Sequence, residues 1–248
     1  MDIYVCVATE FFERRDVAAK QLKTSDGFRW RPAREPVKLP IRGRYVTLEP
    51  LKSRSHAAAL YEATHGPGHD KQLWDFMFVG PFINRADFAL WLAACADSED
   101  PLFFAIVDKR RGALGMVSFM RINPGHGVIE LGNIFFAAPL QKRRGATEAI
   151  FLMLRQCFER WGYRRVEWKC DARNRRSQRA ALRFGFQREG YFRQHMVIKG
   201  DSRDTVWFAI IDRDWPRLRD AYRHWLAPAN FDREGGQRAK LRARLRGY

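Results

Sequence analysis

The chain has 248 residues with a formal net charge of +17, and 46% of them are apolar. A chain of this length and apolar content can bury one full core, which excludes a largely disordered protein. No apolar run reaches the roughly 20 residues that cross a bilayer, and the first residues lack the basic leader of a secretion signal. The cysteines show no paired spacing, so we expect reduced thiols in a cytoplasmic protein.

Positive charge is spread along the whole chain and is densest at its end, where residues 232–248 carry six cations against two anions. Such a tail could contact RNA or a ribosomal surface. A solvated basic helix or a frayed end would have the same composition. The net charge alone therefore does not select a nucleic-acid partner.

Strands and helices alternate along most of the sequence. Residues 1–40 have weak periodicity and three prolines, which predicts an extension outside the core. Apolar residues at period two predict strands, and apolar residues at helical spacing after Asn84 and Asn174 predict capped helices. The expected strands are 44–51, 102–107, 114–122, 128–137, 165–171, 186–198 and 205–211; the expected helices are 53–64, 84–96, 146–161, one from Asn174, and 215–226. A β–α–β crossover amid these strands favours a mixed α/β sheet.

The junction between the strand 128–137 and the next helix is the most informative stretch. Its turn carries Lys142, Arg143 and Arg144 immediately before the helix. A strand–turn–helix junction directs free backbone N–H groups and the positive end of the helix dipole at whatever lies above it. The pattern favours a phosphate site, although an ordinary solvated basic turn would have the same sequence.

This junction resembles the acetyl-CoA-binding motif of the GNAT superfamily of N-acetyltransferases, whose turn has the form Gln/Arg-x-x-Gly-x-Gly/Ala. Gln141 and Ala146 match its two ends, whereas Arg144 stands at the central glycine position and a glycine follows it. Two later blocks, residues 174–190 and residues 204–215, are similar to the branch that contains the ribosomal-protein alanine N-acetyltransferases. The three blocks occur in the family's order and cover roughly residues 40–226.

The resemblance implies a fold and a division of the chain. The expected α/β fold has a mixed, mostly antiparallel central sheet that is splayed at its middle strands to hold acetyl-CoA, with helices on both faces. We expect an N-terminal extension over residues 1–40, an N-acetyltransferase domain over residues 41–226 and a basic C-terminal tail over residues 227–248.

The resemblance also assigns residues to acetyl-CoA. A bulged central strand is expected to hold the pantetheine arm, and the turn with the helix start is expected to hold the pyrophosphate. The expected contacts are Ile134, Phe135, Phe136, Gln141, Lys142, Arg143, Arg144, Gly145, Ala146, Thr147, Asn174 and Ser177. One of the two phenylalanines is expected to be a plain core residue, and Asn174 can cap its helix in either case.

Amine acetylation needs a base for the ammonium proton and an acid for the departing thiolate. Glu130, a carboxylate in an apolar strand, is the first candidate base; the alternative is a structural pair with an arginine. His195 is the second candidate, because its ordinary pKa suits proton transfer near neutrality. The family's usual acid, a tyrosine four residues before a Gly-Phe pair, is replaced by Ala181. The resemblance therefore points to Ser177 as the substitute acid, with Tyr191 in reserve.

These observations together predict an acetyl-CoA-dependent N-acetyltransferase that moves an acetyl group to a primary amine by direct transfer in a ternary complex. The acceptor is a protein N-terminus or a small-molecule amine, and a homodimer is one option. No metal site is expected, because the Gly-Pro-Gly between His65 and His69 prevents one shared helical face. The alternative is a non-catalytic module of the same fold, in which Arg144 fills the pyrophosphate site and the basic face binds RNA or a ribosomal surface.

Overall fold

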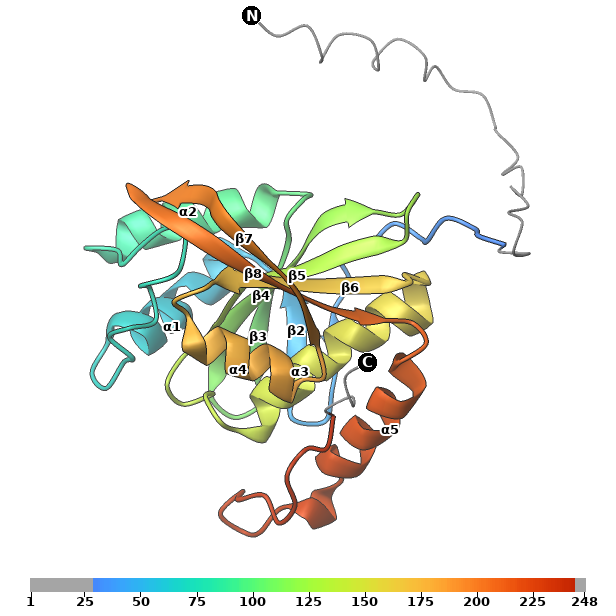
Figure 1. The fold of residues 1–248 in the computed structure, drawn as a ribbon. Helices are drawn as coiled ribbons and strands as arrows, with labels where there is room; N and C mark the ends of the chain where they lie inside the picture. Colours follow the sequence, from blue (N-terminus) through green and yellow to red (C-terminus); the bar gives the residue numbers. More distant parts are fainter. Residues whose placement is uncertain (1–28, 244–248) are drawn as a thin grey trace, which may run out of the picture. The chain divides into compact units, whose positions relative to one another are not determined.

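The computed structural model describes residues 29–243, whose strands form one eight-stranded sheet (Figure 1). Neighbouring strands are antiparallel except β5 and β6, which are parallel. Their order in the sheet is β1-β2-β3-β4-β5-β6-β8-β7. The strands are β1 Ile41–Arg42, β2 Val46–Pro50, β3 Leu102–Asp108, β4 Gly112–Asn123, β5 Val128–Phe136, β6 Arg165–Asp171, β7 Gln187–Ile198 and β8 Asp201–Ile211.

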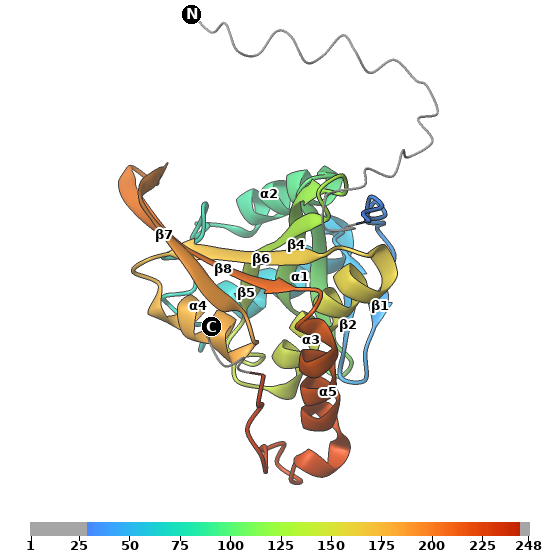
Figure 2. The same cartoon turned by 45° about the vertical axis from the view of Figure 1, so that its right-hand side comes forward.

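Helices cover both faces of this sheet, as expected, and each set of helices has its own core. The helices are α1 Ser53–His65, α2 Arg85–Asp97, α3 Arg144–Arg155 with the π-helical turn η1 Gln156–Trp161, α4 Arg175–Arg183, α5 Trp215–Leu226 and the 3-10 turn η2 Pro228–Asn230. Leu60 and Phe88 pack α1 and α2 against one face. On the other face α5 lies alongside α3, where Phe151 stacks on Tyr222 (Figure 2).

The central pair of strands separates soon after it begins. β5 and β6 are paired only at Val128–Arg165, Ile129–Val166 and Glu130–Glu167. The remaining residues of β5 pair with β4 alone, and those of β6 pair with β8 alone. The sheet is therefore splayed at its middle strands, which confirms the expected fold.

A bulge bends β5 beyond the point of separation. Gly132 is paired with Ser118 and Phe135 with Met116, so β5 has one more residue than β4 over this interval. Asn133 in the bulge has a φ of 49°, a left-handed conformation that asparagine tolerates better than most residues. The buried Ser118 hydroxyl donates to the Gly132 carbonyl at 3.1 Å and accepts from Asn133 Nδ2 at 3.0 Å, which fixes the bulge.

One lysine joins the two strands where they part. The Lys169 side chain on β6 is only 5% exposed. Its ammonium lies 2.7 Å from Glu130 Oε2 on β5 and 2.8 Å from Glu167 Oε2 on its own strand. It also lies 3.7 Å from the centre of the Trp207 ring, which covers it from β8. Lys169 therefore neutralises two buried carboxylates at the last paired position.

Helix α3 begins at Arg144, two residues earlier than predicted. Lys142 has a left-handed φ of 57° and Arg143 has the extended conformation of an N-cap, so the turn is shorter than its composition suggested. The run predicted to extend to residue 161 is α-helical only to Arg155 and then continues as η1. Gly162, with a φ of 76°, ends it in the left-handed conformation common at helix ends.

Glu148 ties this helix to the start of the sheet. Its buried carboxylate accepts hydrogen bonds from the backbone N–H groups of Arg44, Tyr45 and Val46 at 2.7, 2.6 and 2.9 Å. A Cβ on Gly43 would lie 2.6 Å from this carboxylate, so the approach of the chain needs glycine. The sequence block around Glu148 therefore has a structural role in this fold.

Strand β8 starts at Asp201 instead of the predicted Thr205, because the β7–β8 turn is tight. Lys199 and Gly200 both have positive φ, at 50° and 83°, as a two-residue hairpin turn requires. Toward the C-terminus, Phe231 and Ala243 are buried in the main core, so part of the expected basic tail packs on the domain. No helix among residues 29–243 is long and apolar enough to cross a membrane.

Removing the Glu148 carboxylate should destabilise the fold strongly. Glu148→Ala leaves three backbone donors without their acceptor, and we expect a loss of about 3 kcal/mol in the free energy of unfolding. For a domain of this size that corresponds to a fall in Tm of about 6–12 °C, measurable by calorimetry. Glu99→Ala, at an exposed position before β3, is the matched control. Equal Tm values for the two variants would show that the hydrogen bonds of Glu148 do not contribute to stability.

Replacing Lys169 should lower the free energy of unfolding by an amount that depends on pH. Lys169→Met leaves Glu130 and Glu167 buried without their shared cation, and removing one partner of such a cluster typically costs about 3–5 kcal/mol. In the wild type, burial acts to raise the pKa of Glu167, but hydrogen bonds from Lys169 and Arg165 lower it overall. Glu167 therefore stabilises the fold at pH values above its unfolded pKa, and this stabilisation is lost as the pH falls.

In the variant both carboxylates should instead titrate at raised pKa values. The loss in free energy of unfolding should therefore be greatest at neutral pH. It should shrink as acidification protonates the two carboxylates. Denaturant unfolding at several pH values measures this, with the exposed Lys109→Met as control. A loss that is small or independent of pH would contradict the role of Lys169.

Candidate active site

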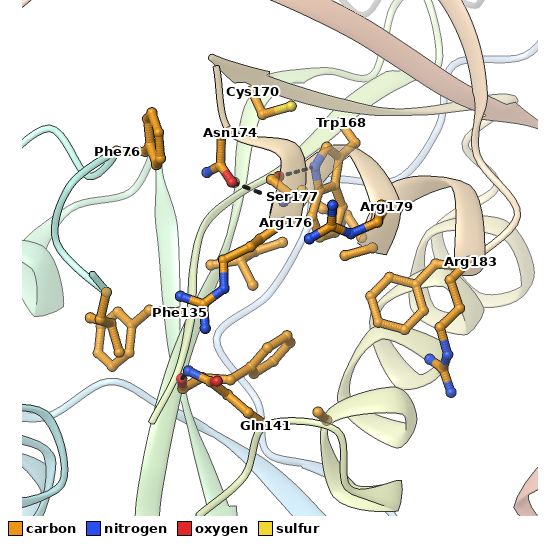
Figure 3. Close-up of a pocket in the computed structure, with 18 of the residues that line it drawn as sticks. Phe76, Phe135, Gln141, Trp168, Cys170, Asn174, Arg176, Ser177, Arg179 and Arg183 are labelled. Carbon is orange, nitrogen blue, oxygen red and sulfur yellow. Dashed lines mark hydrogen bonds between the residues drawn. The ribbon is translucent and has the colours of Figure 1, made fainter. Parts of the chain in front are cut away.

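A cavity of about 1160 Å³ opens where β5 and β6 diverge. Its wall is formed by these two strands, the first turn of α3, helix α4, the segment 70–78 and the β7–β8 hairpin (Figure 3). All of the predicted site residues line it except Gly145, which is buried against Val46 and Leu140. Residues far apart in the sequence thus meet in one space.

The N-terminus of α3 forms one end of this cavity. Its N-cap residue, Arg143, provides no side-chain hydrogen bond to the helix. The first backbone N–H groups of a helix have no intrahelical partner, so an uncapped end favours an anion. Lys142, Arg143, Ala146 and Thr147 line the cavity around it.

Gln141 and Arg144 have contacts that the sequence did not predict. The Gln141 amide donates to the Phe136 carbonyl at 3.0 Å and to Asp70 Oδ2 at 2.8 Å. The Arg144 guanidinium lies over Tyr45, 4.3 Å from the ring centre, and 5.4 Å from the centre of Phe231. These two rings hold the guanidinium in place, and Arg144 still lines the cavity.

A row of arginines on α4 faces this end of the cavity and was missed in the sequence analysis. Arg176, Arg179 and Arg183 line the cavity, and Figure 3 shows them on the α4 side, across from Gln141. Their spacing of three and four residues places them on one helical face, which the sequence alone could have shown. Arg176 pairs with Asp70 at 2.8 Å. Arg183 donates to Thr147 Oγ1 at 3.0 Å, and burial lowers its pKa.

The start of α4 carries a fixed hydroxyl group. Asn174 caps the helix, its Oδ1 accepting from the backbone N–H of Ser177 at 2.9 Å (Figure 3). The Ser177 hydroxyl accepts from Trp168 Nε1 at 2.9 Å, which orients it as a donor, and the neighbouring Cys170 thiol lies within its reach. Burial raises the pKa of the neighbouring Cys170 thiol to about 11, which keeps that thiol protonated near neutral pH.

The middle of the cavity is lined by the bulged part of β5. Phe135 is the core residue of the expected pair, because it is buried and packs 5.6 Å from Trp74, ring centre to ring centre. Ile134 and Phe136 are half-buried in the cavity wall. Tyr191, the reserve acid, is not among the lining residues, and its hydroxyl donates to Asp204 at 2.5 Å.

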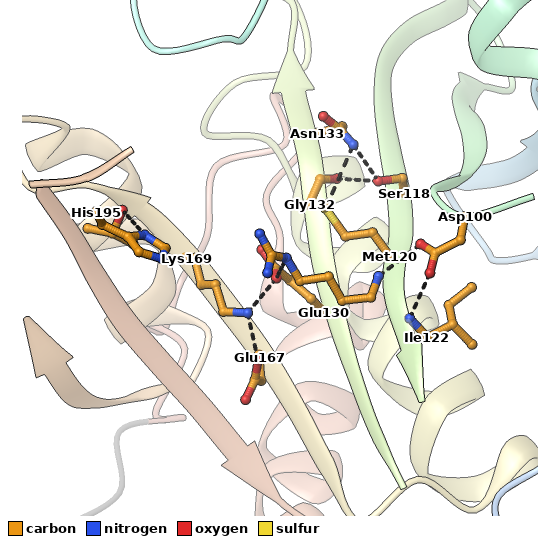
Figure 4. Close-up of polar contacts among 12 residues, drawn as sticks. Asp100, Ser118, Met120, Ile122, Glu130, Gly132, Asn133, Glu167, Lys169 and His195 are labelled. Carbon is orange, nitrogen blue, oxygen red and sulfur yellow. Dashed lines mark hydrogen bonds and ion pairs between the residues drawn. The ribbon is translucent and has the colours of Figure 1, made fainter. Parts of the chain in front are cut away.

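Glu130 lies at the other end of the cavity, where the strands part (Figure 4). Its Oε2 is 2.7 Å from Lys169 Nζ and 3.1 Å from Arg121 Nε, so both expectations for this residue hold together: it is paired, and its pKa is raised. Burial is the main cause of the raised pKa, against the two cations that oppose it. A Cβ on Gly132 would be 3.9 Å from the other oxygen, Oε1, which therefore faces the bulge.

His195 comes from the irregular part of β7. Its Nδ1 is 3.0 Å from the Thr205 hydroxyl (Figure 4). Burial lowers its pKa, as do the charges of Arg121, Arg203 and Lys169. The ring is therefore neutral at physiological pH, and in the tautomer whose Nδ1–H donates to Thr205 its Nε2 can accept a proton. No group of three or more His, Cys, Asp or Glu side chains within residues 29–243 is placed to hold a metal ion.

Comparison with known proteins identifies the family. A family model for the acetyltransferase (GNAT) domain matches residues 46–187. The chain is 46% identical to a GCN5-related N-acetyltransferase from Brucella melitensis, with a TM-score of 0.83 over 86% of this chain and 96% of that one. It is 38% identical to a probable acetyltransferase of the GNAT family from Chromobacterium violaceum, with a TM-score of 0.71 over 82% and 100% of the two chains.

A ribosomal L7/L12 alpha-N-protein acetyltransferase has a similar structure at 18% identity, with a TM-score of 0.60 over 70% of this chain and 94% of that one. At this identity the likeness shows the shared fold alone. A search of curated proteins finds no match. The sheet splayed at β5 and β6, the matching domain model and the two closely similar structures show that this chain belongs to the GNAT family of acetyltransferases.

Proposed function

We propose that this protein is an acetyl-CoA-dependent N-acetyltransferase that acts on a primary amine by direct transfer in a ternary complex. One observation carries the proposal: a single cavity is lined by an uncapped, arginine-rich helix end, by a buried carboxylate and by a neutral histidine. The first end suits the phosphates of acetyl-CoA, and the second suits deprotonation of an ammonium group. Acetyl-CoA supplies the activated acetyl thioester.

The α3 end would hold the phosphate groups. The N–H groups of the first turn of α3 face the cavity together with Lys142 and Arg143. Arg179 and Arg183 approach from α4, and guanidinium groups bind phosphate oxygens through paired hydrogen bonds. Arg176 can join them by exchanging Asp70 for a phosphate.

The bulge and the start of α4 would position the thioester. The Asn174 Oδ1 is used by the helix cap, which leaves its amide nitrogen to donate to a carbonyl of the pantetheine arm. Ser177 is our candidate for protonating the thiolate, since the hydrogen bond from Trp168 to its oxygen orients the hydroxyl as a donor. The hydroxyl proton would pass to the sulfur as the amine displaces it.

Two groups remain candidates for the base. Glu130 Oε1 faces the bulge, and the raised pKa of this carboxyl makes it a better proton acceptor than an exposed glutamate. His195 is neutral and partly exposed. We favour Glu130, acting directly or through one water, because Lys169 and Arg121 hold it rigidly at Oε2 alone.

The acceptor belongs to one of two classes, a protein N-terminus or a small-molecule amine. The motifs around Asn174 and Asp204, which resemble the branch that modifies ribosomal-protein N-termini, support the first class. The catalytic unit would span residues 41–226, and the part of the following tail that packs on it would belong to the same folded body.

Binding of acetyl-CoA tests the phosphate site. At about a hundred times its Kd, the ligand should stabilise the wild type by about 2.7 kcal/mol. Arg179→Gln should weaken binding about tenfold, the value of one hydrogen bond to a charged group. Arg213→Gln, an exposed arginine outside the cavity, is the control, and Arg144→Gly should bind as the wild type does. Calorimetric titration measures all four proteins, and equal affinities of the Arg179 and Arg213 variants would refute the site.

Rate measurements against pH test the base. Glu130→Gln should lower kcat/KM by about 10²–10⁴-fold and remove the acid limb of the profile. In the wild type that limb should lie above the ordinary carboxyl pKa, because the pKa of Glu130 is raised and the rate falls when the carboxylate is protonated. His195→Asn should keep the limb. If the His195 variant loses the limb instead, and the Glu130 variant keeps it, the histidine is the base.

A further inference from the structure

Arg203 on β8 is buried without a hydrogen-bond partner for its side chain in the described part of the chain. The residue is 7% exposed and lines the cavity. Among residues 29–243 no side chain or carbonyl accepts a hydrogen bond from its guanidinium, and its Nε is buried and unsatisfied. Buried polar groups in proteins are nearly always paired, and a buried charge is costly without a counter-charge. An arginine left in this state points to a ligand.

The two nearest carboxylates are occupied by other cations. Asp171 accepts from the backbone N–H of Arg173 at 2.7 Å and from its guanidinium at 2.9 Å. Glu130 is held by Lys169 and Arg121. Arg203 feels the charge of both carboxylates but forms an ion pair with neither. Within residues 29–243 the protein therefore supplies no anion for this guanidinium.

Arg203 lies on the acceptor side of the cavity. Its neighbour two residues along β8, Thr205, contacts His195, and the charge of Arg203 helps to lower the pKa of that histidine. The α3 and α4 end, with its own arginines, is the other part of the cavity. A group bound at Arg203 would thus be close to both candidate bases.

A neighbouring side chain covers the Arg203 guanidinium and so strengthens its attraction for an anion. Phe78 lies over the guanidinium, 5.5 Å from ring centre to the central carbon. Lys199, at the tip of the same hairpin, donates to the carbonyls of Trp74 and Gly80 at 2.9 and 2.6 Å, which holds the segment that carries Phe78 in place. Excluding water around a charge makes its interaction with a counter-charge stronger.

We propose that the acetyl acceptor is an amine that also carries a carboxylate, and that Arg203 binds this carboxylate. The planar guanidinium matches a carboxylate through two parallel hydrogen bonds. The inference rests on the proposed acetyltransferase function. The carboxylate could be the α-carboxylate of a free amino acid or an acidic side chain next to a peptide N-terminus, and the two sources are separated by the choice of substrates.

Matched acceptors test the preference. Alanine is compared with alaninamide, and the peptide amide Ala-Asp-Ala with Ala-Asn-Ala, so that each pair exchanges one carboxylate for an amide. Rates are expressed per unprotonated amine, because the α-amine of alanine is more basic than that of alaninamide. We expect kcat/KM to favour the carboxylate member of one pair by about 10–100-fold, the value of hydrogen bonds to a charged group. The pair that shows the effect identifies the source. Equal rates within both pairs would overturn the proposal.

Variants connect the preference to Arg203. Arg203→Met should remove the discrimination by slowing only the carboxylate member, whereas Arg193→Met, at an exposed position on the same hairpin, should retain it. Without ligand, Arg203→Met should melt at the same temperature as the wild type or higher, because it removes a buried unpaired charge. If its Tm falls by several degrees, or both members slow equally, the guanidinium has a structural role and the proposal is wrong.

A binding measurement separates this proposal from the proposed function. In the presence of CoA, the preferred carboxylate amine should raise the Tm of the wild type but not that of Arg203→Met. If no amine is acetylated although acetyl-CoA binds, the acetyltransferase function fails, and this thermal shift alone decides whether Arg203 holds a carboxylate. A shift that is equal for the carboxylate and the amide, or equal in the variant, refutes the site.

Discussion

The separation of β5 from β6 is the constraint on which the rest of this structure depends. The parallel pairing lasts only from Val128 to Glu130, and Lys169 then bridges Glu130 and Glu167 at the last paired position. Two buried carboxylates would repel each other here without the shared ammonium. The same cluster of charged side chains forms the end of the cavity that opens beyond it. These ionic contacts therefore lie both where the pairing ends and where the site begins.

The cavity has two chemically different ends because two faces of the sheet contribute to it. On one side, α3 and α4 bring an uncapped helix end and a row of arginines. On the other, alternate residues of β6 and β8 present Glu167, Lys169, Thr205 and Arg203 beneath the segment that follows α1. The β5 bulge lies between them, held by Ser118. A ligand that spans the cavity would therefore meet cations at one end and a base at the other.

Much of the site was predictable from sequence because the relevant residues fall within short motifs. The turn that begins at Gln141, the cap at Asn174 and the carboxylate at Glu130 were all placed in one cavity by the fold. The α4 arginines were overlooked although their helical spacing was visible. Lys169 and Arg203 could not be recognised, because each looks like an ordinary cation in a strand until its buried neighbours are known. Only the contacts show that Lys169 is paired twice and that Arg203 has no ion pair within residues 29–243.

By itself, the sequence determined the order of strands and helices, since periodicity and caps act over a few residues. Its resemblance to a known family implied the splayed mixed sheet. It also placed Phe135 and Phe136 on the central strand without showing which belongs to the core. Tertiary structure decided that Phe135 packs on Trp74, that Arg144 stacks on Tyr45 and Phe231, and that Glu130 is both paired and raised in pKa. The reason is physical: burial and the partners of a charge are set by residues distant in sequence, and only the folded chain brings them within a few ångströms.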